Sequence, residues 1–352
     1  MRQQRSESGR RSAFGVTAMI GVAVTALVVL GLAACGDATK SSSEATPPPS
    51  ASAIETIATP SPTAVPSYRG TIAYESYWPR ETADLFVIRT DGKERRELAT
   101  GDAPLAEAAA WSPDGKRIAY QTSRTVSDEP FIWTMNADGS AKLQVTQGGG
   151  GVWPAWSPDA KRLAFISWFY PPTEQPPARV CVIDADGGRR RQVTRGGAND
   201  MQPSWGSDGR IYFLRKPATV SWDSPDGDVY SVRPDGTGLV RVTELEHVGG
   251  FGLSPDAKTL AVHDTEQRRI LLLPVSGGGS PQTLVATDFG QDLMQPVWSP
   301  DGKVIALAHS NLLTPDSWVD ETSQIYIVNA DGSGLSVVPK AELVISVSWR
   351  PE

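Results

Sequence analysis

The sequence has little of what most catalytic and metal sites require. Its 352 residues include two cysteines and three histidines. No G-x-S-x-G motif occurs, so the nucleophile elbow of the α/β-hydrolases is absent. The glycine run at 148–151 is not followed by the Lys-Ser or Lys-Thr pair that completes a phosphate-binding loop. The sequence therefore predicts neither a serine peptidase nor a P-loop nucleotidase.

Positive charge is also scarce. The chain has 33 Lys and Arg residues against 40 Asp and Glu residues, a net charge of -7. Binding to nucleic acid needs a basic surface that neutralises phosphates, and docking on anionic lipid needs a similar surface. The charge balance argues against both kinds of partner.

One long hydrophobic run is present, at the N-terminus. Residues 13–34 are apolar and follow Arg2, Arg5, Arg10 and Arg11, which is the layout of a secretory signal. The end of this run, Leu-Ala-Ala-Cys, resembles the lipobox of bacterial lipoproteins. That resemblance implies that residues 1–34 are a signal peptide and that Cys35 carries the lipid. An uncleaved signal anchor is the alternative, because the run is long enough to span a bilayer.

Residues 35–67 follow as an expected linker. They are rich in Ser, Thr, Pro and Ala and have no apolar period, so we expect a disordered tether that starts at the lipidated cysteine. With Cys35 acylated, Cys181 has no partner for an intrachain disulfide. Its place in a short apolar run predicts that Cys181 fills a slot in the core.

A ten-residue motif recurs through the rest of the chain. WSPDGKRIAY begins at 111, and related segments begin at 156, 205, 253 and 298. Ser-Pro-Asp-Gly suits a type I turn, and each copy also has an Asp-Gly turn after a short apolar run. The segments between turns are short and rich in Ile, Val, Tyr and Phe, which is typical of strands. Each unit is therefore predicted to hold four antiparallel strands.

Such a unit repeated radially is a β-propeller, in which each blade covers its neighbours. We predict an all-β fold over 68–352, a six-bladed propeller of four-stranded antiparallel blades. The body begins without a WSPD segment and ends at VSWRPE, 347–352. The last strand is therefore expected to pair into blade one and close the ring.

These repeats resemble the TolB-type, WD-repeat-like propeller repeat, through W-S-P-D-G-K-x-I-A and the later D-A-D-G turn. The resemblance implies a propeller with a binding role. Together with the lipobox, it implies a protein held on the outer side of a bacterial membrane, at the cell surface or in the periplasm. It implies no cofactor.

Strand direction gives the predicted propeller two different ends. The S-P-D-G and Asp-Gly turns share one end, which we call the turn end. The other end carries the longer connections, and we call it the loop end; function concentrates in loops on a rigid scaffold. We expect two groups of binding residues there. The aromatic candidates are Trp78, Trp153, Trp168, Phe169, Tyr170, Trp222 and Trp318. The polar candidates, expected around the mouth of the central channel, are Glu107, Asp200, Gln202, Asp292 and Gln295.

Both groups have a purely structural alternative: the aromatic residues as anchors that pin the loops, and the polar residues as a solvated rim. The function that we predict is a non-enzymatic, membrane-anchored monomer that contacts an envelope protein, peptide or glycan through the loop end. The alternative is a metal-assisted polysaccharide lyase or hydrolase, with His247, His263 and His309 as candidate metal ligands.

Overall fold

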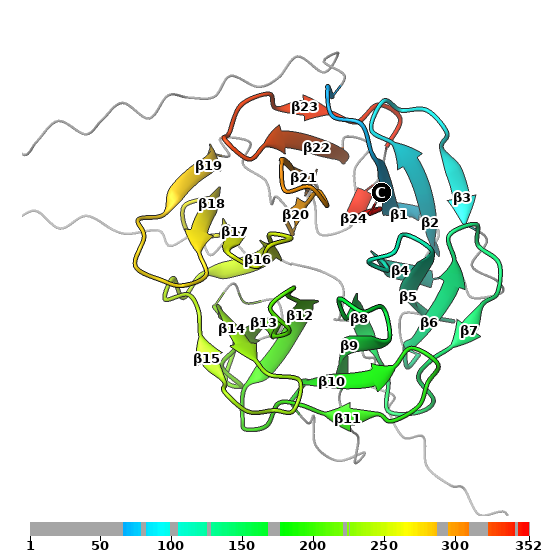
Figure 1. The fold of residues 1–352 in the computed structure, drawn as a ribbon, viewed down its shortest axis with the longest axis vertical. Helices are drawn as coiled ribbons and strands as arrows, with labels where there is room; N and C mark the ends of the chain where they lie inside the picture. The colour runs from blue at the N-terminus through cyan, green and yellow to red at the C-terminus, as the bar shows by residue number, and fades with distance from the viewer. Residues whose placement is uncertain are drawn as a thin grey trace, which may run out of the picture.

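The computed structural model describes residues 66–78, 82–98, 105–124, 128–167, 177–220, 224, 226–286, 295–309, 323–341 and 344–351. Every regular element in these ranges is a β-strand. Figure 1 shows the strands arranged in a ring of sheets, each running from the centre to the rim. None of the described elements is a helix that could cross a membrane.

The strands fall into four ranks from the centre outward. The innermost strands are β4 (Leu105–Trp111), β8 (Val152–Trp156), β12 (Asn199–Trp205), β16 (Val248–Leu253), β20 (Val297–Trp298) and β24 (Val344–Trp349). The second strands are β1 (Thr71–Trp78), β5 (Arg117–Ser123), β9 (Arg162–Ser167), β13 (Ile211–Lys216), β17 (Thr259–Asp264) and β21 (Val304–His309). The third strands are β2 (Thr82–Arg89), β6 (Phe131–Asn136), β10 (Arg179–Asp184), β14 (Asp228–Val232), β18 (Arg269–Pro274) and β22 (Gln324–Asn329). The outermost strands are β3 (Arg96–Leu98), β7 (Leu143–Gln144), β11 (Arg191–Gln192), β15 (Val240–Arg241), β19 (Gln282–Ala286) and β23 (Ser336–Val337).

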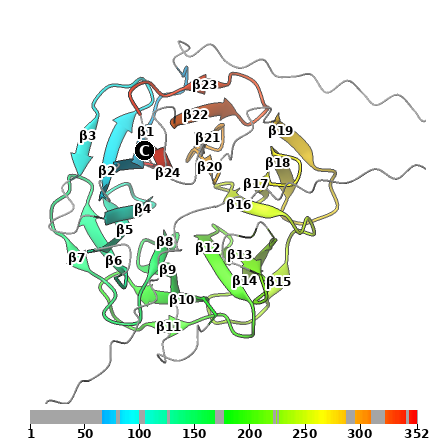
Figure 2. The same ribbon diagram turned by 180° about the vertical axis from the view of Figure 1, so that it is seen from behind.

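The strand pairing confirms an all-β propeller of four-stranded antiparallel blades, but it does not give six separate sheets. Four sheets have four strands each, and the remaining strands form one eight-stranded sheet. A single parallel bridge between Ala83 of β2 and Leu105 of β4 joins the two halves of that sheet. Figure 2 shows β1, β2 and β3 beside β4, β5, β6 and β7 from behind. The predicted number of six blades therefore stays a proposal.

A pair of hydrogen bonds made by the serine hydroxyl explains why the S-P-D-G turn recurs. The hydroxyl of Ser112 donates to Oδ1 of Asp114 at 2.6 Å and accepts from the backbone N–H of Arg117 at 2.9 Å. Ser157 and Ser254 make the same two kinds of bond in their own turns. The serine hydroxyl lowers the pKa of the aspartate in each of these three turns. These hydrogen bonds fix the chain reversal between an innermost strand and the second strand of the same sheet.

The repeated tryptophan joins neighbouring sheets. The indole N–H of Trp156 donates to the carbonyl of Ala110, in the inner strand of the preceding sheet, at 3.0 Å. Trp298 makes the equivalent bond to Gly252 at 3.2 Å. The guanidinium of Arg117 also lies 4.5 Å from the ring centre of Trp156, a cation–π contact. The tryptophan therefore ties neighbouring sheets together at these interfaces, whereas Leu253 takes its place in β16.

The prediction for Cys181 is confirmed. Its side chain is fully buried in β10, in one cluster with Trp156 and Phe165. Burial raises the pKa of the thiol to about 11, which makes it a core residue rather than a reactive group.

The last strand of the chain pairs with the first. β24 runs antiparallel to β1, with Trp349 opposite Ile72 and Val347 opposite Tyr74. Trp349 is 5% exposed and Val344 is fully buried. The indole N–H of Trp349 donates to the carbonyl of Val297, so β24 is also tied to the sheet that precedes it. Figure 1 places the C-terminus at this junction, and we call the meeting of β24, β1 and β4 the seam.

Candidate binding site

The inner strands share a backbone irregularity near the loop end. Three positions before the repeated tryptophan, φ is +51° at Ala108, +52° at Trp153 and +48° at Gln202. The pairing register shifts at the same places in β4, β8 and β12, which marks a β-bulge in each. Left-handed geometry costs a residue with a Cβ about 1–2 kcal/mol, so other contacts must hold these bulges.

Side chains of the second strands β1 and β5 hold two of these bulges. The N–H of Ala108 donates to Oε2 of Glu75 at 3.1 Å, and the N–H of Trp153 donates to Oε1 of Gln121 at 2.9 Å. Gln121 in turn donates from Nε2 to Oε2 of Glu107 at 2.8 Å. The hydroxyl of Ser346 in β24 donates to Oε2 of Glu75 at 2.9 Å. We call Glu75, Glu107, Gln121, Ser346, Gln202 and Gln295 the polar belt.

The two glutamates of the belt are buried and electrostatically linked. Glu75 is 3% exposed and Glu107 is 6% exposed. Burial raises the pKa of Glu75 from 4.5 to about 8, with a further contribution from the charge of Glu107. Burial also raises the pKa of Glu107, to about 7, against the hydrogen bond from Gln121. Among the described residues neither carboxyl group has a cationic partner, so the pair holds at least one proton at neutral pH.

Gln202 and Gln295 continue the belt on either side of Gly250. A Cβ built on Gly250 would lie 3.5 Å from Oε1 of Gln202 and 3.4 Å from Cα of Gln295. Nε2 of Gln295 donates to the carbonyl of Phe251 at 3.4 Å. Oε1 of Gln202 is buried and has no hydrogen-bond partner among the residues that the structure describes. The structure thus brings these two predicted residues together, with an acceptor still open.

Asp200 behaves differently from the other predicted polar residues. It is fully buried, and its carboxylate receives Nε and Nη2 of Arg215 at 2.7 and 3.1 Å. Burial raises the pKa of Asp200, and the two bonds from Arg215 oppose this shift. This ion pair occupies the carboxylate, so Asp200 supports β12 and β13.

The predicted aromatic residues are only partly within the described chain. Trp153 lies in the bulge of β8, half-buried against two of the hydrophobic clusters. Trp78 is the last residue of β1. The other candidates, aromatic and polar, lie outside the described residues: Trp168, Phe169, Tyr170, Trp222, Trp318 and Asp292.

The histidines do not assemble a metal centre in the described ranges. Nδ1 of His247 lies 3.4 Å from Oδ1 of Asp226, and His263 is 6% exposed in β17. His309 ends β21. In the part of the chain that the structure describes, no group of three or more His, Cys, Asp or Glu residues is placed to hold a metal ion.

Sequence reasoning missed Glu75, Gln121 and Ser346. A signal for the first two was present, because IAYE at 72–75 and IAYQ at 118–121 put Glu75 and Gln121 at the same repeat position. Ser346 gains its role only from the pairing of β24 with β1, where it lies opposite Glu75.

The family is shown by comparison with known proteins. The family model described as the TolB beta propeller domain matches residues 68–352, so the chain belongs to this family. TolB from Acinetobacter baumannii is similar in structure, with a TM-score of 0.63, 20% identity, and coverage of 80% of this chain and 67% of that one. Hydrazine synthase from Kuenenia stuttgartiensis has a TM-score of 0.64 and 12% identity, covering 82% and 48%. At these identities the likeness shows the fold alone.

Two curated relatives match shorter stretches. The protein cueball of Drosophila sechellia is 28% identical over 125 residues, which cover 34% of this chain and 18% of that protein. The uncharacterised protein Atu1656 of Agrobacterium fabrum is 28% identical over 133 residues, covering 36% and 44%. The matches thus span less than half of each relative. A TolB-like propeller suggests a binding or scaffold role.

Proposed function

We propose that this protein is a lipid-anchored, extracytoplasmic binding module that contacts an envelope protein, peptide or glycan through its loop end. One observation carries the proposal: Glu75, Glu107, Gln121 and Ser346 near the loop end are bonded to each other and to backbone, and Gln202 keeps an open acceptor. The carboxyl groups of Glu75 and Glu107 are buried and accept hydrogen bonds from Ala108, Ser346 and Gln121. Such an arrangement supports a rigid platform for binding rather than a reaction.

We further propose that the platform is a ring of six blades. The parallel bridge in the eight-stranded sheet joins one residue pair, whereas β4 pairs antiparallel with β5 over five. The eight strands then act as two blades, one of them completed by β24. The bonds from Ser346 and Ala108 to Glu75 support this division. The first joins β24 to β1 within one blade, and the second joins β4 of the next blade to β1.

The anchor has a direct test in Cys35. Replacing it by Ala is expected to abolish labelling of the full chain by a palmitate analogue in bacterial cells, because the acylated thiol is lost. Cys181→Ala is the matched control. The thiol of Cys181 is buried in the core and is not the expected site of acylation, so labelling should persist in this variant. Labelling that survives in the Cys35→Ala variant would rule out the lipid anchor.

The binding surface is tested by crosslinking in the protein's own cells. The Trp168→Ala, Trp222→Ala double variant is expected to reduce capture of the main crosslinked species about tenfold, as for loss of central aromatic contacts. Its unfolding transition should stay unchanged. The control is Leu239→Ala with Val240→Ala, which removes apolar side chains 47% and 52% exposed at the outer rim. Equal capture by both double variants would contradict the loop end as the contact surface.

A further inference from the structure

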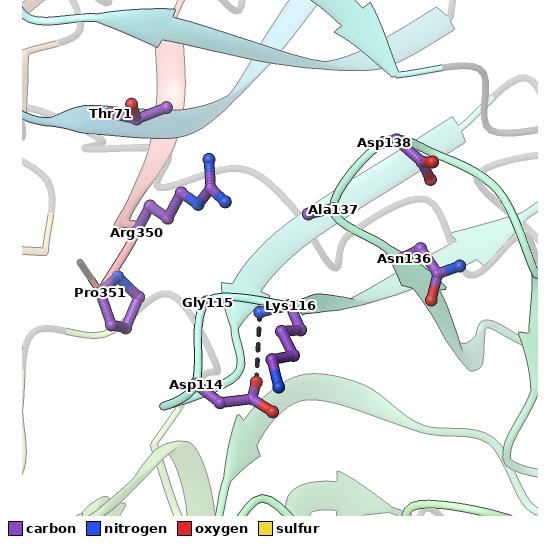
Figure 3. A pocket seen from close by; sticks show the side chains of 9 residues that line it. All are labelled: Thr71, Asp114, Gly115, Lys116, Asn136, Ala137, Asp138, Arg350 and Pro351. Carbon is purple, nitrogen blue, oxygen red and sulfur yellow. Dashed lines mark hydrogen bonds between the residues drawn. The ribbon is translucent and has the colours of Figure 1, made fainter.

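A cleft lies at the turn end of the seam, far along the strands from the polar belt. Its volume is about 810 Å³, and it opens between the end of β24, the start of β1 and the turns around β5 and β6. Figure 3 shows its lining, with Thr71 and Arg350 on one wall and Lys116 and Ala137 on the other. A volume of this size is in the range of small-ligand sites.

The cleft lies where the two ends of the chain meet. The first residue of β5 is Arg117, whose guanidinium covers Trp156 and donates to the carbonyl of Ala160 at 2.6 Å. The first residue of β9, Arg162, covers Trp205 in the same way, at 4.9 Å. At the equivalent position β1 has Thr71, as β17 has Thr259, and this short side chain lines the cleft.

Arg350 reaches this space from the other side. Its guanidinium lies 5.3 Å from the ring centre of Trp111, and its backbone N–H donates to the carbonyl of Thr71 at 2.9 Å. Figure 3 shows the side chain extending between Thr71 and Ala137. Unlike Arg117, Arg350 makes no side-chain hydrogen bond or ion pair with any residue that the structure describes. Its hydrogen-bond donors are exposed beside the ring of Trp111 and have no partner among the described residues.

The acidic residues of the lining do not take those donors. Oδ1 of Asp114 accepts from the hydroxyl of Ser112 at 2.6 Å and from the N–H of Lys116 at 3.1 Å. Oδ1 of Asp138 accepts from the N–H and the hydroxyl of Ser140 at 2.9 and 2.6 Å. Figure 3 shows Asp138 directed away from Arg350. Both aspartates are engaged by their own turns.

We propose that this cleft binds a carboxylate group of an acidic peptide, held by Arg350. A guanidinium stacked on an indole matches a carboxylate with two parallel hydrogen bonds. Thr71 adds a hydroxyl donor, and the ammonium group of Lys116 adds positive charge at the opposite wall. A peptide fits better than an acidic sugar because Trp111 is 7% exposed and offers no free aromatic face for a sugar ring. The site lies at the opposite end from the proposed partner surface and stands independently of it.

The test is calorimetric titration of the full-length protein with N-acetylated tetraglutamate, with tetraglutamine and tetragalacturonate as comparison probes. Tetraglutamate should bind, with affinity reduced at least tenfold by Arg350→Ala and several-fold by Arg350→Lys, which loses the bidentate fork. Thr71→Arg places a long side chain at the wall of the cleft and adds a positive charge, so it should also abolish binding by filling the space. Arg195→Ala, an exposed arginine elsewhere, should bind as the wild type does.

Two results would overturn the proposal. Undiminished tetraglutamate binding by the Thr71→Arg variant would mean that charge attraction, and not the cleft, holds the peptide. Binding of tetragalacturonate in preference to tetraglutamate would assign the cleft to acidic glycans. Circular dichroism of each variant establishes that the fold is intact.

Discussion

We expect the free energy of unfolding of this protein to fall as the pH is raised from 5 to 9. In the folded state Glu75 and Glu107 have pKa values of about 8 and about 7, above the ordinary 4.5. The folded protein thus binds these protons more tightly than the unfolded chain. The stabilisation is complete below pH 4.5 and is lost as the pH rises through 7 and 8. The expected loss from pH 5 to 9 is on the order of 7 kcal/mol, from the two raised pKa values together.

The groups that face the pair do not reverse this sign. Glu75 receives the N–H of Ala108 and the hydroxyl of Ser346, and Glu107 receives the amide of Gln121. The one charged group among the causes of the Glu75 shift is Glu107 itself. The aspartates of the S-P-D-G turns have lowered pKa values, so their contribution is lost only as the pH falls below 3.8. Burial also raises the pKa of Asp200, which acts in the same direction, so variants of Glu75 and Glu107 are needed to isolate the contribution of the buried pair.

Urea unfolding at a series of pH values measures this effect. Glu75→Gln keeps an acceptor for Ala108 and removes the titration of that residue. Its stability should still fall up to about pH 7, where Glu107 titrates, then level off and exceed that of the wild type at pH 9. Glu107→Gln should lower the remaining pKa of Glu75 and weaken the slope. Glu266→Gln, at an exposed position, should follow the wild type. A wild-type curve that is flat over this range would show that the pair is not buried together.

Removal of residues 343–352 should abolish the cooperative unfolding transition. β24 supplies the fully buried Val344 and the nearly buried Val347 and Trp349, and it covers β1. Without it, the seam loses its inner strand, the bond from Ser346 to Glu75 and the anchor of Trp349 on Val297. The combined loss is comparable to the roughly 5–15 kcal/mol by which a typical domain is stable. Arg350→Ala, an exposed change in the same segment, should leave the transition in place.

The repeat made most of the fold predictable. Ser-Pro-Asp-Gly specifies a turn through bonds that are local in sequence, such as those of Ser112, so strand order and blade composition follow from the sequence. Pairing of β24 with β1 also follows, because VSWRPE and YRGTIAY complement each other as halves of one unit.

The bulges and the cleft were not predictable in the same way. The left-handed residues at the bulges are Ala108, Trp153 and Gln202, and none of these residue types indicates positive φ. Of the expected polar site, Gln202 and Gln295 come together, whereas Asp200 pairs with Arg215 and Glu107 is buried beside Glu75. The cleft depends on which arginine covers each tryptophan, and that is decided by contacts between sheets far apart in sequence.

The most direct measurement is thermal unfolding of the chain that lacks residues 343–352, recorded with and without a synthetic peptide of that sequence. If the two ends of the chain complete one sheet, the shortened protein has no cooperative transition and the added peptide restores one near the temperature of the intact protein. A shortened protein that melts as the intact one does, with no response to the peptide, would contradict a ring held together by its own ends.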